Sequence, residues 1–191
     1  MIITHLVGID PGMQGAIAIY NTHEQVIHKL INNPVDEEKR EYKQEELVAI
    51  LKEFNPENTF CILEKQHCMP GEGLPRTFKT GFGFGLFVGL LRGLRIPHQI
   101  TYAKEWQRRV LINYPKTMPI KQRSILNAKR FFNLEHLFRT ERSRVDHDGL
   151  ADALNMVIYG MKFLSGEYGE CQHSTNQIGV CIKCGELVDK V

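Results

Sequence analysis

The sequence predicts an α/β fold in which a mixed five-stranded sheet is flanked by helices. Two observations indicate this: three strand-like segments follow one another near the N-terminus, and helices then alternate with strands. With 191 residues and 22.0 kDa, the chain has the length of one globular domain plus a small appendage. We expect the domain over residues 1–166 and the appendage over residues 167–191.

Five segments have the composition of strands. Apolar runs at 2–9 and 15–20 are separated by a turn rich in Pro and Gly, which predicts a hairpin. The other predicted strands are 25–31, 59–63 and 97–102. Asp10 directly follows the first strand and Glu64 follows the fourth. Ligand sites in such sheets collect at the carboxyl ends of strands, so both positions are candidates for a functional site.

Apolar residues at helical spacing predict the helices. Residues 148–164 are apolar on most sides, so this helix is expected to be largely buried. In the glycine-rich segment 81–94 a helix is expected from about Gly83, because its leucines share one face. The remaining predicted helices are 44–54, 103–111 and 120–132. The long segments expected to be loops are 32–43 and 65–80.

Charge is distributed unevenly along the chain. Residues 92–144 contain 13 Lys/Arg and 3 Asp/Glu, a net charge of +10, although the whole chain carries only +2. Residues 1–75 have a net charge of −6 and residues 145–191 a net charge of −4. The basic block predicts a polyanion-binding face, with solvated helix faces as the alternative.

The N-terminus has neither a basic n-region nor a cleavage site. No run approaches the roughly 18–20 apolar residues that cross a bilayer. We therefore expect a cytoplasmic protein that does not bind membranes.

Four carboxylates stand at positions that suggest chemistry when taken together. Asp10 alone has a structural explanation as a turn residue, and Asp148 has one at a helix N-terminus. Glu64 ends an apolar strand, where such an explanation is weaker. Asp148 and Asp152 are one helical turn apart, so they share a face with Cβ atoms about 5–6 Å apart. The neighbours of Asp152 are apolar, and a buried carboxylate is costly unless it is paired or metal-bound.

Two strand ends and one helix face can converge on a single place. Carboxylates gathered there would repel one another, and divalent cations would remove that repulsion. Two such ions about 3.5–4 Å apart activate water and stabilise the leaving oxygen of a phosphodiester. The sequence thus predicts a metal-dependent nuclease whose Mg²⁺ or Mn²⁺ ligands are Asp10, Glu64, Asp148 and Asp152.

Three segments carry a family resemblance. GIDPGMQGAIAIY, CILEKQ and HDGLADALNMVIYG are similar, in order and approximate separation, to the acidic motifs of RuvC-like Holliday junction resolvases. The resemblance covers roughly residues 5–165. Between the motifs, GFGFGLFVGLLRG, the Trp106 region and KQRSILNAKRFF are most similar to the phage and chloroplast branches of the family.

This resemblance implies an RNase H-like fold, a homodimer and symmetric nicking of four-way DNA junctions with two Mg²⁺ or Mn²⁺ ions. By motif, Asp10 is the first-strand aspartate, Glu64 the mid-chain glutamate and Asp152 the last aspartate. The third ligand departs from the pattern, because the three-residue spacing of many bacterial members would place it on a glycine. Asp148 is the candidate for that position, with His147 as an alternative ligand or proton-transfer residue.

The resemblance also assigns residues that would contact DNA. Lys121 is similar to a family lysine near the scissile phosphate, where it would stabilise the transition state. The family's aromatic wedge is replaced by His67, so contacts with the junction centre are expected from Phe82 or Phe84, with Phe87 as a further candidate and core packing as the alternative. Backbone contacts are expected from Lys104, Arg108, Arg109, Arg123, Lys129 and Arg130, with plain solvent exposure as the alternative for each.

The C-terminal segment contains Cys-x-His followed by Cys-x-x-Cys. Four N and S ligands match a tetrahedral structural zinc site, which would consist of Cys171, His173, Cys181 and Cys184. A redox pair or unliganded thiols are the alternatives. We expect a small zinc-ribbon-like appendage that extends the DNA-binding or dimer surface.

Three other functions compete with the resolvase. A nuclease of the same fold could cut flaps or forks. A non-catalytic junction-binding protein is disfavoured by the intact acidic residues. An actin-like sugar kinase or ATPase also begins with a strand, an Asp-x-Gly turn and a hairpin, but requires a second phosphate loop and a longer chain.

Overall fold

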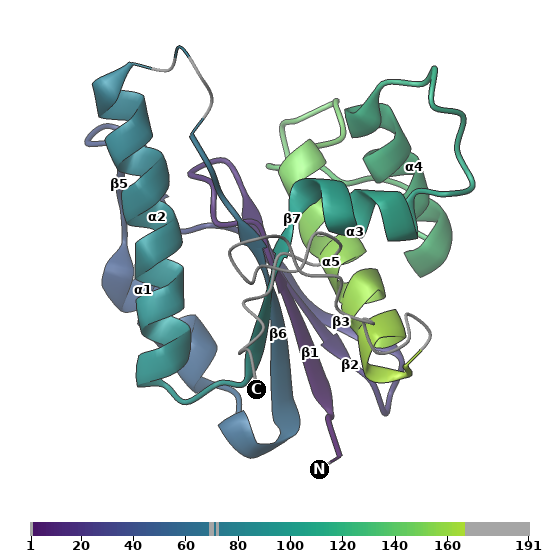
Figure 1. Cartoon of the computed structure of the whole chain (residues 1–191), viewed down its shortest axis with the longest axis horizontal. Coiled ribbons are helices and arrows are strands. Elements are labelled where there is room, and N and C mark those ends of the chain that lie inside the picture. The colour runs from purple at the N-terminus through teal and green to yellow at the C-terminus, as the bar shows by residue number, and fades with distance from the viewer. Residues whose placement is uncertain (1, 69–70, 72, 167–191) are drawn as a thin grey trace, which may run out of the picture. The chain divides into compact units, whose positions relative to one another are not determined.

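The computed structural model describes residues 2–68, 71 and 73–166 (Figure 1). The chain divides into two compact units, Met1–Gly160 and Met161–Val191. The first unit contains a five-stranded sheet with the order β3-β2-β1-β6-β7. Its strands are β1 (His5–Ile9), β2 (Ala16–Asn21), β3 (Val26–Asn32), β6 (Thr59–Lys65) and β7 (His98–Tyr102). The first three are antiparallel and the β1–β6 and β6–β7 pairs are parallel, which confirms the predicted mixed sheet.

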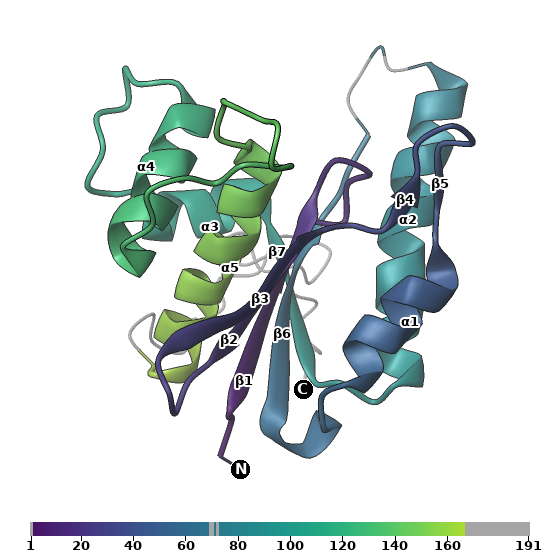
Figure 2. The same cartoon turned by 180° about the vertical axis from the view of Figure 1, so that it is seen from behind.

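Helices cover both faces of this sheet. Figures 1 and 2 show α1 and α2 on one face and α3, α4 and α5 on the other. The helices are α1 (Gln44–Lys52), α2 (Leu74–Gly93), α3 (Ala103–Val110), α4 (Ile120–Phe132) and α5 (Asp148–Leu164), with a 3-10 turn at Pro56–Asn58. None of the helices in the described part of the chain is long and apolar enough to cross a membrane.

Helix α2 begins earlier than predicted. It starts at Leu74, so the second half of the segment 65–80, expected to be a loop, is helical. Proline is tolerated in the first turn of a helix, where its missing N–H is not needed, and Pro75 occupies that turn. The buried stripe also differs from the leucine face used for the prediction: it consists of Gly83, Phe87 and Leu91.

The segment 32–43, also expected to be a loop, contains a short hairpin. Strands β4 (Val35–Asp36) and β5 (Glu41–Tyr42) pair with each other in an antiparallel manner. Tyr42 is buried, and its hydroxyl donates a hydrogen bond to the carbonyl of Pro11 at 2.7 Å. This contact ties the hairpin to the turn that follows β1.

The side chains of the central strands alternate between two cores. Ile9 and Leu63 belong to the core that the sheet forms with α1 and α2. Gly8 faces α5, because a Cβ added to it would clash with the Ala153 carbonyl oxygen. A Cβ on Gly160 would lie 2.9 Å from side-chain atoms of the strands. A glycine on the strand side, Gly8, and one on the helix side, Gly160, therefore let α5 approach β1 and β6 closely.

Candidate functional site

Strand alternation directs Asp10 and Glu64 to the same face of the sheet. In the parallel β1–β6 pair, Ile9 is opposite Leu63, and both point into the core with α1 and α2. The residue after each of them, Asp10 just past the end of β1 and Glu64 on β6, therefore points to the other face, which α5 covers. Figure 1 shows that the carboxyl ends of β1 and β6 lie at the edge of the sheet where α5 begins.

Helix α5 brings the other two carboxylates to this edge. Asp148 is its first residue and Asp152 follows one turn later on the same face. The first turn lies against the turn after β1, because a Cβ on Gly149 would be 2.5 Å from the Gln14 carbonyl oxygen. A side chain at this position would push α5 away from Asp10.

The pKa values show that these carboxylates interact. Burial, followed by the charge of Asp10 and Asp152, raises the pKa of Glu64 to about 8. Burial raises the pKa of Asp152 to about 7 against the opposing Ser124 hydrogen bond, and the charges of Asp10 and Asp148 add to the rise. The pKa of Asp10 is raised to about 6, by burial and by the charge of Asp148, against the opposing Gly12 N–H. Three segments far apart in the sequence thus form one concentration of negative charge.

The turn that carries Asp10 is held by several hydrogen bonds. The Asp10 Oδ1 atom accepts from the Gly12 N–H at 3.0 Å and from the Gln66 side chain at 3.3 Å. The buried Asn33 side chain donates to the carbonyls of Asp10 and Gly12, both at 2.7 Å. Gly15 is required next to them, because a Cβ there would clash with the Asp10 backbone.

Buried donors also hold Glu64 and Asp152. The indole of Trp106, which is fully buried, donates to Glu64 Oε1 at 3.3 Å. The Ser124 hydroxyl donates a hydrogen bond to Asp152 Oδ1. Asn155, itself fully buried, donates to the Ser124 Oγ at 2.8 Å and so directs the serine proton towards Asp152. Asn127 fixes the orientation of the Asn155 amide by donating to its oxygen at 2.6 Å.

Asp148 is in a different environment. Its Oδ2 atom is 2.5 Å from the Lys121 Nζ, and this ion pair is open to solvent because the lysine side chain is 76% exposed. Burial raises the pKa of Asp148, but the hydrogen bond and charge of Lys121 and the charge of His147 outweigh it, so the pKa is lowered. The adjacent His147 has its pKa lowered by burial, and its buried Nδ1 has no hydrogen-bond partner among the described residues.

The donor set suits a divalent cation, although the side chains are not arranged as a metal centre. Carboxylate oxygens are the ligands that Mg²⁺ and Mn²⁺ prefer, and the raised pKa values reflect burial and the mutual repulsion of these carboxylates, which a cation would relieve. Within the described part of the chain, however, no group of three or more His, Cys, Asp or Glu side chains could hold a metal ion as placed. Lys121 and Ser124 occupy oxygens of Asp148 and Asp152 instead.

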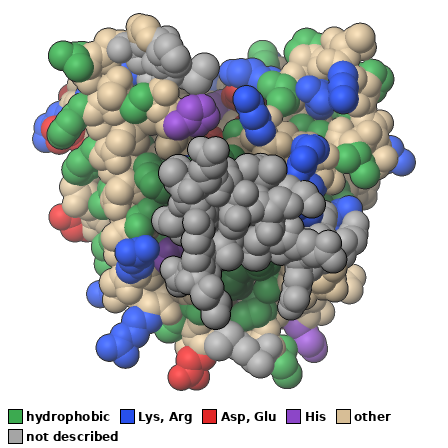
Figure 3. Space-filling view, viewed as in Figure 1, with side chains coloured by type: hydrophobic (Ala, Val, Ile, Leu, Met, Phe, Trp, Pro, Cys, Tyr) green, Lys and Arg blue, Asp and Glu red, His purple; other side chains and the backbone are tan. Residues whose placement is uncertain are grey.

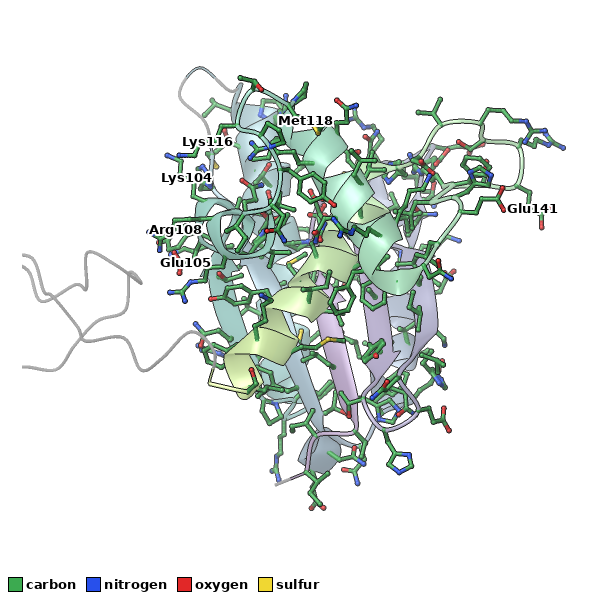
Figure 4. All side chains as sticks on the ribbon, turned by 90° about the vertical axis from the view of Figure 1, so that its right-hand side faces the viewer. Lys104, Glu105, Arg108, Lys116, Met118 and Glu141 are labelled. Carbon is green, nitrogen blue, oxygen red and sulfur yellow. The ribbon has the colours of Figure 1, made fainter. Side chains whose placement is uncertain are left out.

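The basic residues expected to contact DNA lie on α3 and α4. In Figure 3, Lys and Arg side chains gather over this side of the molecule, and Figure 4 shows Lys104 and Arg108 projecting from α3. Lys104, Arg108 and Arg130 are exposed. Arg108 and Arg109 both pair with Glu105, at 2.8 and 2.5 Å. Arg123 is only partly exposed, and Lys129 pairs with Asp146 at 2.8 Å.

The aromatic candidates differ in exposure. Phe82 is 45% exposed, whereas Phe84 is partly buried against the core of α1 and α2. Phe87 is fully buried, so it has the core role that the sequence left open. The proposed zinc ligands, Cys171, His173, Cys181 and Cys184, lie outside the described residues.

Sequence reasoning missed the residues that hold the carboxylates. Asn33, Gln66, Ser124 and Asn155 carry neutral side chains, and nothing in the sequence distinguishes them from ordinary polar residues. One signal was available for Asn155, because it is a polar residue in the apolar helix 148–164, three positions after Asp152. At that spacing the two side chains share a helix face.

Comparison with solved structures identifies the fold. A structure of Thermus thermophilus RuvC in complex with a Holliday junction substrate matches with a TM-score of 0.59 and 14% identity, over 85% of this chain and 96% of that one. A second Thermus thermophilus RuvC structure matches with a TM-score of 0.55 and 16% identity, over the same shares. The fold is therefore the RNase H-like fold of RuvC. No protein-family model and no curated protein matches the sequence.

Proposed function

We propose that this protein is a metal-dependent endonuclease that nicks Holliday junctions symmetrically. The observation that supports it most is the convergence of Asp10, Glu64, Asp148 and Asp152, from two strand ends and one helix, on the carboxyl edge of a RuvC-like sheet. The solved neighbour with this fold was captured on a Holliday junction substrate.

Two Mg²⁺ or Mn²⁺ ions are proposed to bind at these carboxylates. When bound, the ions would neutralise the four carboxylates and supply a water that is activated near neutral pH. The side chains present meet the chemical requirement, because three have raised pKa values and all supply oxygen ligands. To bind the ions, Asp148 would give up its contact with Lys121, or keep it through one oxygen, and Asp152 would do the same with Ser124.

The chain's own residues then position the DNA and stabilise charge. Lys121, exposed at the solvent side of the site, would stabilise negative charge on the scissile phosphate. Burial lowers the pKa of His147, which favours the neutral imidazole, so this residue beside Asp148 is the proposed proton acceptor. Trp106 and Ser124 would keep Glu64 and Asp152 oriented while DNA binds.

Branched DNA would lie across the basic face formed by α3 and α4. The exposed cations of this basic face, Lys104, Arg108 and Arg130, would contact DNA phosphates. Such contacts carry no sequence information. Binding should therefore weaken steeply with salt. Symmetric nicking of a four-way junction requires two active sites, so we further propose that the protein is a homodimer. Sedimentation equilibrium would measure the mass of the assembly and test this.

We also propose that residues 167–191 bind one structural zinc ion through Cys171, His173, Cys181 and Cys184. Four N and S ligands at this spacing support the assignment. Protein purified without chelator should contain one zinc per chain by atomic emission. A zinc content near zero would contradict it.

One cleavage experiment tests the main proposal. The full chain is freed of metal, supplied with Mg²⁺ or Mn²⁺ and incubated with an end-labelled four-way junction, a Y-fork and a linear duplex. We expect paired nicks in two opposing strands of the junction and little cutting of the duplex. Cutting of the fork alone would favour a flap or fork nuclease. Equal cutting of all three DNAs, or of none, would contradict a resolvase.

A further inference from the structure

One polar side chain next to the carboxylates has no hydrogen-bond partner. Thr101, on β7, is 3% exposed, and its Oγ1 is buried without a hydrogen bond to any of the described residues. Buried polar groups in proteins are almost always paired, because an unpaired one lowers stability. An exception calls for an explanation, and a role at a catalytic or ion site is one such explanation.

The register of the sheet places Thr101 beside Glu64. In the parallel β6–β7 pair, Leu63 is opposite Ile100 and Glu64 is opposite Thr101. Leu63 and Ile100 both pack in the core with α1 and α2, so the next residue on each strand points to the other face. Neighbouring strands are about 4.7–4.9 Å apart. A rotation of the Thr101 side chain, or of the Glu64 carboxylate, would therefore bring the hydroxyl within hydrogen-bond distance of a carboxylate oxygen.

Glu64 is held less firmly than the other two buried carboxylates. Asp10 Oδ1 accepts two hydrogen bonds, and the donor to Asp152 is itself held by Asn155. The bond from the Trp106 indole to Glu64 Oε1 measures 3.3 Å, beyond the usual range of about 2.7–3.2 Å. An indole N–H is also a single donor, so Trp106 fixes one carboxylate oxygen and leaves the other to a different group.

We propose that Thr101 is a positioning residue of the carboxylate site, whose hydroxyl donates to Glu64 when a divalent cation is bound. This inference rests on the proposed function, because it requires the cation. Carboxylates that ligate metal ions are themselves hydrogen-bonded, and these bonds fix the orientation of the ligand. The buried hydroxyl would then serve the ion site at a cost to the stability of the fold.

A purely structural role is the competing explanation. Threonine is frequent in strands because its branched Cβ fits the pleated surface, and valine has the same branching without a hydroxyl. If only shape mattered at Thr101, valine would be the better residue, since it buries no polar atom. Replacing the threonine by valine therefore separates a role of the hydroxyl from a role of the side-chain shape.

Thr59 provides a matched control. It is also a fully buried threonine in the sheet, but its hydroxyl donates to the Asn55 carbonyl at 2.7 Å. It begins β6, at the end of the strand away from Glu64. Thr59→Val thus removes a paired hydroxyl that does not reach the carboxylates, whereas Thr101→Val removes an unpaired one beside them.

Stability and Mn²⁺ binding of the full chain test the proposal, because the expected changes have opposite signs. In buffer free of Mg²⁺ and Mn²⁺, Thr101→Val should raise the Tm by about 2–4 °C, since an unpaired polar atom is lost. The same variant should bind Mn²⁺ about 10–100-fold more weakly by calorimetry. Thr101→Ser retains the hydroxyl and should restore most of the affinity. Thr59→Val should lower the Tm and bind Mn²⁺ like the wild type.

Several results would overturn the role of Thr101. One is unchanged Mn²⁺ affinity in Thr101→Val, and another is an equal loss in Thr101→Ser. A Tm that falls in Thr101→Val would also do so, because the hydroxyl would then be paired within the fold. A wild-type chain that binds no Mn²⁺ would overturn it together with the proposed metal site. Junction cleavage is scored separately, so a chain that shows the expected Mn²⁺ pattern but cuts no DNA would refute the proposed function and leave the role of Thr101 standing.

Discussion

The carboxylate site and a second region, which we call the α2 groove, lie on either side of one turn, residues 10–15, but they are built differently. The α2 groove lies between this turn, the β4–β5 hairpin and the first turns of α2, and its lining includes Arg40, Tyr42, Arg76, Phe78, Lys79 and Phe82. At the carboxylate site the key side chains are buried or partly buried, and fully buried Trp106 and Asn155 support them. In the groove, Phe78 and Phe82 are exposed, and their rings contact each other and, for Phe82, the Tyr42 ring.

This difference indicates a division of labour. Catalytic groups must stay within a narrow geometry, which packing and hydrogen bonds from surrounding residues provide. A surface that binds nucleic acid without reading sequence needs accessible charge and ring faces, and tolerates movement. Since the sequence predicts that Phe82 contacts the junction, substitutions in the first region should affect chemistry, and those in the second should affect binding.

The largest effect is expected from Asp152→Asn. Losing a carboxylate from the proposed metal site should reduce junction cleavage by roughly 10³-fold, whereas binding to the junction should survive because the basic face is unchanged. Gel-based cleavage and anisotropy on the same preparation measure both. Asp36→Asn, in the β4–β5 hairpin, is the matched control. Cleavage retained by Asp152→Asn would mean that the site is elsewhere.

A smaller loss is expected from Ser124→Ala, which removes the donor to Asp152 and leaves the carboxylates in place. Affinity for Mn²⁺, measured by calorimetry, should fall by about 10–100-fold while the fold remains intact by circular dichroism. Ser124→Thr retains the hydroxyl and should restore much of the affinity. If Ser124→Ala binds Mn²⁺ like the control Ser143→Ala, a partly exposed serine that makes no contact with the carboxylates, Ser124 has no positioning role.

The thermal stability of the metal-free protein should depend on pH. The folded pKa values of Asp10, Asp152 and Glu64, about 6, 7 and 8, are above the ordinary values of 3.8, 3.8 and 4.5. The folded state therefore holds protons more tightly, and the stability this provides is present below the ordinary values and lost as pH rises through about 6 to 8. Tm should fall by several degrees between about pH 4 and pH 8, because the unfolded carboxyls lose their protons before the folded ones do, and Mg²⁺ or Mn²⁺ should reverse the fall. A Tm that responds to neither pH nor metal would contradict a shared carboxylate site.

The smallest expected effect is a difference in chemical modification between a buried cysteine, Cys61, and an exposed one, Cys68. Burial raises the pKa of the Cys61 thiol, and this residue is fully buried on β6, whereas Cys68 is exposed. Iodoacetamide at pH 8 should therefore modify Cys68 and leave Cys61 unmodified until the protein unfolds. Peptide mass spectrometry checks this. Equal modification of both in the native protein would show that the β1–β6 core opens readily.

Local patterns in the sequence were sufficient for most of the fold. Apolar runs and helical spacing predicted all five strands of the sheet and the five α-helices of the described residues, because side-chain periodicity reflects which face is buried. They failed at the start of α2 and at the β4–β5 hairpin. There, Pro75 and the polar residues around Tyr42 read as loop signals. Pro75 instead occupies the first turn of α2, and Tyr42 ties the hairpin to the carbonyl of Pro11.

The sequence by itself determined that acidic residues end two buried strands and share one turn of an apolar helix, because strand alternation and helical spacing are local properties. Only the tertiary structure decided which groups hold them. Ser124 is 28 residues from Asp152, Trp106 is 42 from Glu64, and Gln66 is 56 from Asp10. The α2 groove likewise joins residues from four separate segments. Such contacts depend on how closely helices pack on the sheet, which Gly8, Gly149 and Gly160 permit and which no local pattern encodes.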